Sequence, residues 1–271
     1  MDNFLGDWVN KIDDLNQVFM NNKPFPYLVI QNFLNKQFME RVADEFPDTF
    51  EEWNKYNNPL EVKYATNDIN QGSIKLLFDT LKSTQFIEAI CKLTGIKNLE
   101  ADPTLHGAGL HVHPKNGRLF VHLDYEKHPI LTDKERRINI VLYVSRDWQP
   151  EWNGQTELWD ACKCVYKSDV VFNNAIIFQT SDESWHGLPN IIKCPDNTFR
   201  KTIGFYYISD IVSGSNRDKI GNDGSGYRTK ATYINVGEPD KRIDEFIKIR
   251  PLRRITQSDI ESIWPEWTDE L

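Results

Sequence analysis

The sequence contains six histidines, and two of them stand where a metal ion could use them. His122 and Asp124 are two residues apart in the segment Val-His-Leu-Asp. Residues i and i+2 of a β-strand point to the same face, so an imidazole and a carboxylate are expected to converge. His186 follows the apolar stretch 175–178 and precedes a glycine that lets the backbone turn. Two histidines and one carboxylate, with open positions opposite, form a ligand set suited to non-haem Fe(II), although six histidines supply such a triple by chance fairly often.

A guanidinium and a hydroxyl are expected on a later strand. Arg200 and Thr202 stand at the head of the apolar run 202–208. By the same period of two, both side chains lie on one face of the strand and are expected to point into the interior that holds the metal. A buried arginine must be neutralised, and a dicarboxylic cosubstrate does this with two parallel hydrogen bonds. The alternative is a surface arginine that ends a loop.

Other side chains near these motifs are candidates for substrate contact. His111 and His113 form a second His-x-His pair, but no carboxylate stands at the next alternate position, so they are expected to line the pocket or face solvent. Tyr125 and His128 follow the metal strand in a loop, where a solvated position and a substrate contact are equally open. Trp185 is either a core anchor or a substrate contact.

The elements that must position these residues change in character near residue 100. Before it, apolar residues at three-to-four spacing predict a helix over 4–19, one after Asn35 and two between 74 and 93, with an extended run at 27–30. The polar stretch 51–72 is expected to be loop. After residue 100, runs rich in β-branched and aromatic residues predict strands at 118–123, 138–144, 170–172, 175–178 and 202–208. This pattern is typical of an antiparallel sandwich or barrel.

Three segments follow from this division. Residues 1–99 are expected to be a helical support segment with the first core strand, residues 100–211 the core, and residues 212–271 a flexible loop and C-terminal tail. The loop is expected because residues 213–226 are rich in Gly, Ser, Asn and Asp. The tail is expected to be an appendage that Trp264 and Trp267 pack onto the body.

Composition excludes several classes of protein. With 39% hydrophobic and 27% charged residues the chain reads as one globular protein, and its apolar runs are too short to cross a membrane. The acidic N-terminus lacks the features of a signal peptide, so a cytoplasmic location is expected. A net charge of −8 makes nucleic acid an unlikely partner, and the basic run within 241–254 is expected to be a solvated face. The four cysteines are expected to be free thiols.

Taken in order, these motifs resemble one family. They are His122-x-Asp124, then residues 137–144 with Asp-Trp at 147–148, then Trp-Asn-Gly-Gln-Thr-Glu-Leu at 152–158, then His186 and Arg200-x-Thr202. This series resembles the prolyl 4-hydroxylase-like branch of the Fe(II)/2-oxoglutarate-dependent dioxygenases over about residues 100–210. The run PFPYLVIQNFL at 24–34 also looks like the entry strand of that family. Relatives usually have Gly-Gly where this chain has Asn153-Gly154, a departure that is expected to leave the fold intact and leaves the local turn geometry open.

The resemblance implies a fold and a site. The fold would be α+β, mainly β, with a double-stranded β-helix (jelly-roll) core braced by N-terminal helices. Fe(II) would be held by His122, Asp124 and His186. The cosubstrate 2-oxoglutarate would be held by Arg200 and would react together with O2. Ascorbate is the expected reductant. By position, the rest of the cosubstrate pocket would comprise Thr202, Tyr143, Asn139, Val141 and Thr156.

The implied reaction is hydroxylation of an unactivated C–H, with release of succinate and CO2. Relatives that halogenate carry a small residue at the position of Asp124, so the carboxylate favours hydroxylation. The substrate stays open between a peptidyl proline, an amino acid and a small metabolite. Two alternatives are a cupin-like isomerase or sugar-binding jelly roll that uses another metal without 2-oxoglutarate, and a catalytically silent scaffold.

Overall fold

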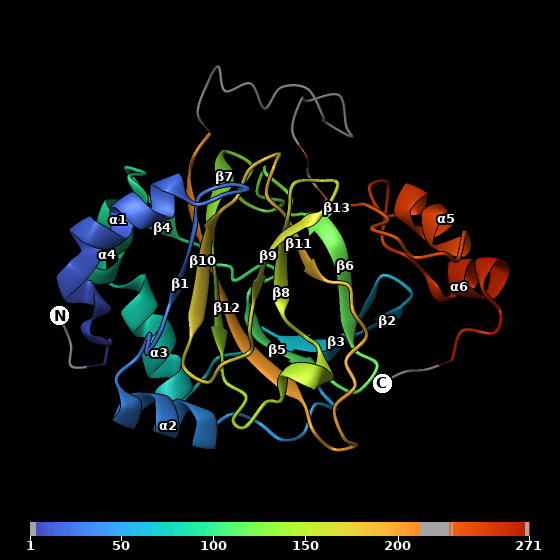
Figure 1. The fold of residues 1–271 in the computed structure, drawn as a ribbon, viewed down its shortest axis with the longest axis horizontal. Coiled ribbons are helices and arrows are strands. Elements are labelled where there is room, and N and C mark those ends of the chain that lie inside the picture. The colour runs from blue at the N-terminus through green and yellow to red at the C-terminus, as the bar shows by residue number, and fades with distance from the viewer. Residues whose placement is uncertain (1–3, 212–227, 229, 269–270) are drawn as a thin grey trace.

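The computed structural model describes residues 4–211, 228, 230–268 and 271, and its strands form one antiparallel sheet that nearly closes into a jelly roll (Figure 1). The helices are α1 Ile12–Asn21, α2 Lys36–Asp44, α3 Gly72–Lys82, α4 Thr84–Thr94, α5 Arg242–Ile249 and α6 Gln257–Ile263. Short 3-10 helices span Asp7–Lys11 and Pro150–Trp152. The strands are β1 Tyr27–Ile30, β2 Asn54–Asn58, β3 Glu61–Thr66, β4 Glu100–Ala101, β5 Gly109–His113, β6 Arg118–Leu123, β7 Lys134–Tyr143, β8 Thr156–Trp159, β9 Cys164–Ser168, β10 Ala175–Gln179, β11 Trp185–Leu188, β12 Arg200–Asp210 and β13 Thr232–Tyr233.

The path through the sheet explains how distant motifs meet. Neighbouring strands follow the order β1-β10-β7-β12-β5-β3-β6-β11-β8-β9, with β2, β4 and β13 attached beside this path. β6 and β11 pair antiparallel with His122 opposite His186, while β12 lies between β7 and β5. The predicted jelly roll is therefore confirmed.

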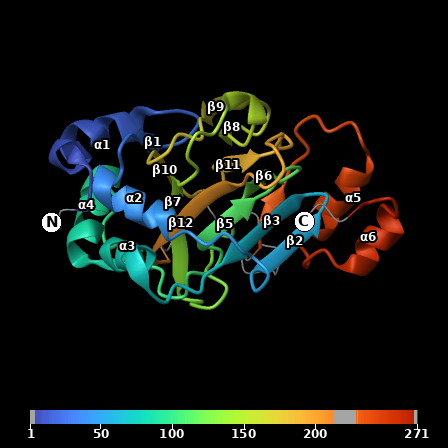
Figure 2. The same cartoon turned by 90° about the horizontal axis from the view of Figure 1, so that it is seen from below.

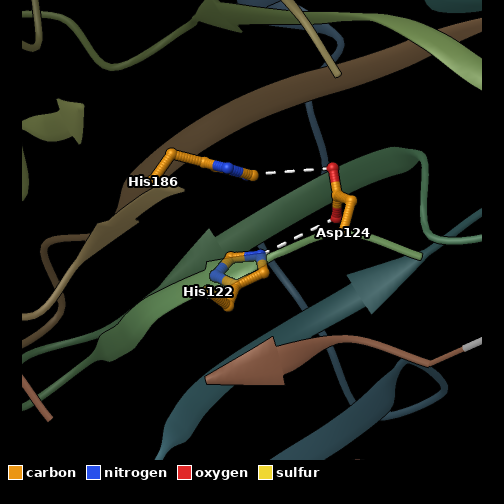
Figure 3. Close-up of side chains that lie close together, drawn as sticks. All are labelled: His122, Asp124 and His186. Carbon is orange, nitrogen blue, oxygen red and sulfur yellow. Dashed lines mark ion pairs between the residues drawn. The ribbon is translucent and has the colours of Figure 1, made fainter. Parts of the chain in front are cut away.

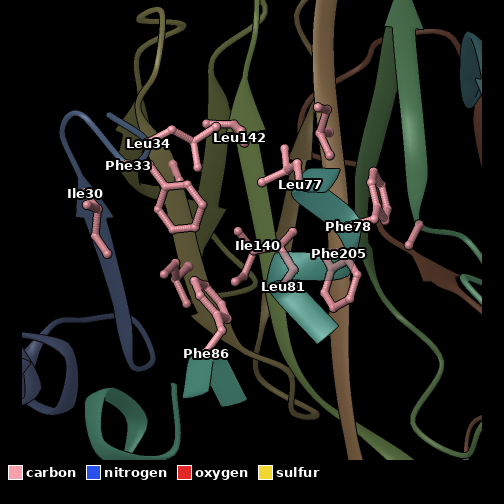
Figure 4. Close-up of a cluster of buried hydrophobic side chains, with 14 of the residues drawn as sticks. Ile30, Phe33, Leu34, Leu77, Phe78, Leu81, Phe86, Ile140, Leu142 and Phe205 are labelled. Atoms are coloured by element: carbon pink, nitrogen blue, oxygen red, sulfur yellow. The ribbon is translucent and has the colours of Figure 1, made fainter. Parts of the chain in front are cut away.

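Helices α1 to α4 cover one side of this sheet, as Figures 1 and 2 show from two directions. The helix expected after Asn35 is capped by it: the Asn35 side chain accepts a hydrogen bond from the backbone N–H of Phe38 at 2.8 Å. Gly95 ends α4 with a φ of 71°. The apolar faces of the helices then pack on β7 and β12 through a buried cluster that Figure 4 displays.

Strands β7 and β12 have two differently used faces. Ile140, Leu142 and Phe205 point to the helices and are almost fully buried in the apolar cluster. The alternate residues of the same strands, which point to the other face, line an internal cavity; Asn139 and Thr202 are two of them. The period of two in a strand thus separates the supporting core from the polar interior.

Two strand expectations were wrong. The polar stretch 51–72 is not a plain loop, because it forms the β2–β3 hairpin, and β3 lies in the sheet between β5 and β6. Its inward residues Glu61 and Lys63 are buried as an ion pair with 2.9 Å between Oε1 and Nζ, so the strand shows no apolar alternation. The run 170–172 is not a strand; it leads into a turn in which Asn173 takes a φ of 63°.

The C-terminal segment was also wrongly expected to be an appendage. β13 pairs with β6, and the buried residues Ile243, Phe246 and Ile260 pack with Phe120 of β6. α5 and α6 therefore lie against the side of the sheet away from α1 to α4 (Figure 1). The predicted packing of Trp264 and Trp267 is confirmed, since both join this cluster.

The remaining expectations concern the chain as a whole. The four cysteines are free, as predicted. Among the described residues no helix is long and apolar enough to span a membrane. The flexible loop expected at 213–226 lies outside the described residues. The segment limits 1–99, 100–211 and 212–271 stay a prediction, and β2 and β3 come from the first of these segments.

Candidate active site

The structure brings His122, Asp124 and His186 together inside the sheet (Figure 3). His122 Nε2 lies 3.7 Å from Asp124 Oδ1, and His186 Nε2 lies 3.8 Å from Asp124 Oδ2. One ligand atom from each of the three residues lies within 4.8 Å of the others, and all three side chains are buried. The β6–β11 pairing and the two-residue spacing of His122 and Asp124 produce this convergence.

The second nitrogen of each imidazole is fixed by the backbone. His122 Nδ1 lies 2.9 Å from the carbonyl oxygen of Phe120, and His186 Nδ1 lies 2.9 Å from that of Ser184. A carbonyl only accepts, so each Nδ1 donates and each Nε2 carries a free lone pair. Burial, followed by the charge of His122, lowers the pKa of His186 to about 4, which keeps this imidazole neutral at physiological pH. Both rings are thus prepared for metal coordination.

Asp124 is kept ionised by a buried arginine. Burial alone would raise the pKa of Asp124, but the Arg136 guanidinium and the two imidazoles outweigh it and hold that pKa well below its ordinary value. Arg136 Nη1 lies 3.2 Å from Asp124 Oδ1. The amide of Asn139 donates to the other oxygen at 3.4 Å. Asp124 therefore offers a permanently charged, oriented carboxylate.

Arg136 is itself enclosed on every side. Its guanidinium lies 3.8 Å from the ring centroid of Tyr125 and 3.3 Å from that of Tyr206, and it also donates to the Tyr125 hydroxyl and to the carbonyl of His106. Cation–π contacts on both faces add to the ion pair. Burial opposes the charge of Arg136, but these two phenols and Asp124 raise its pKa above the ordinary value.

At the other end of the cavity, Arg200 has only neutral partners in the described part of the chain. Its Nε donates to the carbonyl of Gly154 at 2.6 Å and its Nη2 to Thr156 Oγ1 at 3.1 Å, while the guanidinium lies 5.3 Å from the Tyr143 ring centroid. The side chain is 2% exposed. Burial without an acidic partner lowers the pKa of Arg200. This end of the cavity has an uncompensated positive charge that an anionic ligand would neutralise.

Of the residues predicted to complete the cosubstrate pocket, Tyr143 and Thr156 contact Arg200, while Asn139 contacts Asp124. The Tyr143 hydroxyl donates to Thr156 Oγ1 at 2.8 Å, so Tyr143, Thr156 and Arg200 form one hydrogen-bonded group. Asn139, Val141 and Thr202 line the same cavity.

The unusual turn at Asn153-Gly154 serves this group. Asn153 takes a φ of 62°, which asparagine tolerates better than most residues, and Gly154 takes a φ of 86°. A Cβ on Gly154 would lie 3.1 Å from Arg200 Cδ. Asn153 thus adopts a left-handed conformation that favours glycine, and the Gly154 carbonyl accepts a hydrogen bond from Arg200.

A single cavity of about 470 Å³ joins the triad to Arg200. His111, His113 and Tyr125 line it, and neither ring nitrogen of His113 has a hydrogen-bond partner among the residues that the structure describes. The structure does not bring His128 and Trp185 to this cavity. His128 is instead fully buried with its Nε2 3.1 Å from Asp102 Oδ2, and Trp185, one position from His186, points to the opposite face of its strand.

Sequence reasoning missed several lining residues. Arg136 was overlooked because the period of two, counted from Asn139, places Arg137 in the interior. A register shift between β7 and β12 at this point turns Arg136 inward instead. Arg250 and Arg254 also line the cavity, so the basic run of the tail is not wholly a solvated face. Their approach depends on tail packing, for which the sequence has no local signal.

Comparison with known proteins identifies the core. Residues 108–208 match the family model described as the 2OG-Fe(II) oxygenase superfamily, a range that contains the triad and Arg200. No curated protein matches the chain. A prolyl-4-hydroxylase of Pseudomonas putida is 16% identical with a TM-score of 0.52, over 72% of this chain and 98% of that chain.

A prolyl hydroxylase from Trichoplax adhaerens, solved in complex with a hypoxia inducible factor oxygen degradation domain peptide fragment, is also similar. It is 17% identical with a TM-score of 0.53, over 74% of this chain and 93% of that chain. At these identities the likeness establishes the shared fold. Together with the family match it agrees with the resemblance drawn from the sequence: residues 108–208 match the 2OG-Fe(II) oxygenase superfamily, whose members use Fe(II), 2-oxoglutarate and O2, and the fold is like that of the prolyl 4-hydroxylases.

Proposed function

We propose that this 2OG-Fe(II) oxygenase hydroxylates an unactivated C–H of its substrate at an iron held by His122, Asp124 and His186. Arg200 binds the distal carboxylate of 2-oxoglutarate, which is converted to succinate and CO2. The observation that carries this proposal is the pairing, in one cavity, of a preformed facial triad with a buried guanidinium that has no acidic partner among the described residues.

The residues fit Fe(II) and 2-oxoglutarate by their donor chemistry. Two imidazoles with free Nε2 atoms and one ionised carboxylate leave open positions on a six-coordinate metal. Iron, when bound there, supplies the activation of O2. The protein's contribution is to keep Asp124 charged through Arg136, to keep His186 neutral, and to present Thr156 and Arg200 to the cosubstrate.

The candidate substrates stay those predicted from the sequence, a peptidyl proline, an amino acid or a small metabolite. Ascorbate is the proposed reductant for iron that oxidises in uncoupled turnovers, and the cytoplasm is the proposed compartment. An isomerase or lectin without 2-oxoglutarate has no use for a buried arginine with neutral partners, which disfavours that alternative.

Anaerobic addition of Fe(II) and 2-oxoglutarate tests the proposal. We expect a visible metal-to-ligand charge-transfer band and, with O2, formation of succinate. The variant His186→Ala should bind Fe(II) at least 100-fold more weakly, because one of three protein ligands is lost.

His106→Gln is the matched control. His106 lines the same cavity but lies outside the triad, so this variant should keep its iron affinity within threefold. Absence of the band in the wild-type protein, or normal iron binding by His186→Ala, would refute the assignment.

A further inference from the structure

The charge of the cavity wall is opposite to that of the whole chain. The protein has a net charge of −8, yet the described residues that line the cavity include six cationic side chains and two carboxylates. The carboxylates are Glu61 and Asp124. The cations are Lys63, Arg136, Arg200, Lys230, Arg250 and Arg254.

Half of these cations already have a partner or an assigned ligand. Lys63 pairs with Glu61 at 2.9 Å, and Arg136 pairs with Asp124 at 3.2 Å. Arg200 is assigned to 2-oxoglutarate by the proposed function.

The other three, Lys230, Arg250 and Arg254, make no ion pair with an acid within the described ranges. Arg250 does act on Glu61, the partner of Lys63: burial would raise the pKa of Glu61, but Lys63 and then Arg250 lower it. Burial, and then nearby cations, lower the pKa of the His106 imidazole, and Arg254 is one of these cations. Positive charge at this side of the cavity is therefore in excess.

Packed structure positions Arg250, while Arg254 stands four residues later with an exposed side chain. Arg250 directly follows α5, whose Ile243 and Phe246 are fully buried, and its guanidinium lies 5.8 Å from the ring centroid of Tyr233. Tyr233 in turn stacks on His122 with 5.2 Å between ring centroids. Arg254 lies between α5 and the capping box of α6. The fixed position of Arg250 lowers the ordering cost of binding.

The wall also lies outside the part of the chain shared with the family. The family match ends at residue 208, whereas the three cations come from residues 230–254. Residues that hold iron and cosubstrate fall within the match, and residues that would meet the substrate from this side do not. Specificity is thus expected to depend on the C-terminal segment.

We propose that the substrate is a small organic anion whose carboxylate or phosphate is held by Arg250 and Arg254 at the cavity wall. The inference rests on the proposed function, since it presumes that 2-oxoglutarate occupies Arg200. A cavity of about 470 Å³ that also admits the cosubstrate suits a compact molecule. Guanidinium groups bind carboxylate and phosphate oxygens with paired, charge-assisted hydrogen bonds.

The first experiment measures binding without turnover. Inorganic phosphate is titrated by calorimetry into the Zn(II)-loaded protein at saturating 2-oxoglutarate, so that Arg200 is occupied. The double variant Arg250→Gln/Arg254→Gln should bind phosphate at least tenfold more weakly than wild type. The control Lys241→Gln/Lys248→Gln removes the same charge from exposed positions of the same segment and should stay within twofold. No phosphate binding by wild type, or equal binding by the double variant, would overturn the proposal.

The second experiment distinguishes the source of the anion. Succinate release is compared for organic acids, phosphate monoesters, their uncharged amides or alcohols, and an acidic peptide. Stimulation by a small anion and not by its uncharged partner, with a KM at least tenfold higher in the double variant, supports the proposal. Stimulation by uncharged compounds, or by the acidic peptide alone, contradicts it. The anaerobic charge-transfer band tests the proposed function separately, because it needs no substrate.

Discussion

Two buried arginines occupy opposite ends of one cavity. The charge of one is balanced by an acidic side chain, whereas the other has only neutral partners among the described residues. Arg136 on β7 contacts the Asp124 carboxylate, two aromatic rings and a backbone carbonyl. Arg200 on β12 contacts only a backbone carbonyl, a hydroxyl and one aromatic ring. Both side chains are at most 2% exposed.

The difference separates a structural charge from a ligand-binding one. A buried ion with a partner loses stability when the partner is removed, whereas a buried ion without one already bears a desolvation cost. Arg136 is therefore expected to stabilise the folded protein, and Arg200 to become stabilising only when an anion binds. Substitution of each arginine by methionine, which keeps volume and removes charge, tests this distinction.

The largest effect is expected for Arg136→Met. Loss of the guanidinium leaves Asp124 buried without its main partner, so the free energy of unfolding of the metal-free protein should fall by about 3–5 kcal/mol. Urea denaturation measures this change, and Zn(II) should restore part of it by neutralising the carboxylate. Arg146→Met is the control, because Arg146 pairs with Asp44 at the surface and should cost under about 1 kcal/mol. An equal cost for the two variants would remove the structural role of Arg136.

Arg200→Met should show the reverse pattern. Affinity for 2-oxoglutarate, measured by calorimetry on the Mn(II)-loaded protein, should fall about 100-fold, in line with loss of a charge-assisted pair worth about 1.5–3 kcal/mol. Metal affinity and the free energy of unfolding of the metal-free protein should stay within about 1 kcal/mol of wild type, since the substitution leaves no buried charge without its partner. A variant that binds 2-oxoglutarate normally would show that the arginine is only structural.

The Arg200 end should also respond to pH. Burial, then the charges of Arg200 and Lys63, lower the pKa of His113 well below its ordinary value of 6.5. As pH falls below 6.5, His113 binds a proton in the unfolded protein but stays neutral in the folded protein. The free energy of unfolding therefore decreases from its value at neutral pH. His113→Leu should therefore lose less stability than wild type between pH 7.5 and pH 5 in urea titrations, and parallel losses would disprove the neutral buried state.

The sequence predicts the two ends of this cavity unequally. His122, Asp124, Arg200 and Thr202 follow from the period of two within regular strands, and the helices follow from apolar spacing and caps such as Asn35. Arg136 does not, because the register shift beside it reverses which residue faces inward. A bulge depends on the pairing partner, which a local pattern does not contain.

Long-range packing hides the other missed residues. The sequence predicts a loop at β3 because the inward residues of this strand, Glu61 and Lys63, line a polar cavity and not an apolar core. Arg250 and Arg254 reach the cavity only through the burial of α5 against β6. A polar interior thus removes the hydrophobic signal on which strand prediction depends.

The smallest expected effect concerns the hydroxyl that joins Tyr143 to Arg200. Thr156 Oγ1 accepts hydrogen bonds from Tyr143 at 2.8 Å and from Arg200 at 3.1 Å, so its own proton is free to be donated to a carboxylate. Thr156→Val removes that donor and the oxygen that accepts both hydrogen bonds, and 2-oxoglutarate affinity should fall about tenfold, equivalent to about 1.4 kcal/mol. Thr156→Ser keeps the hydroxyl and should bind within threefold of wild type. If the valine variant binds as tightly as the serine variant, the hydroxyl contributes neither a ligand contact nor a needed orientation of Arg200, and recognition at this end depends on the guanidinium alone.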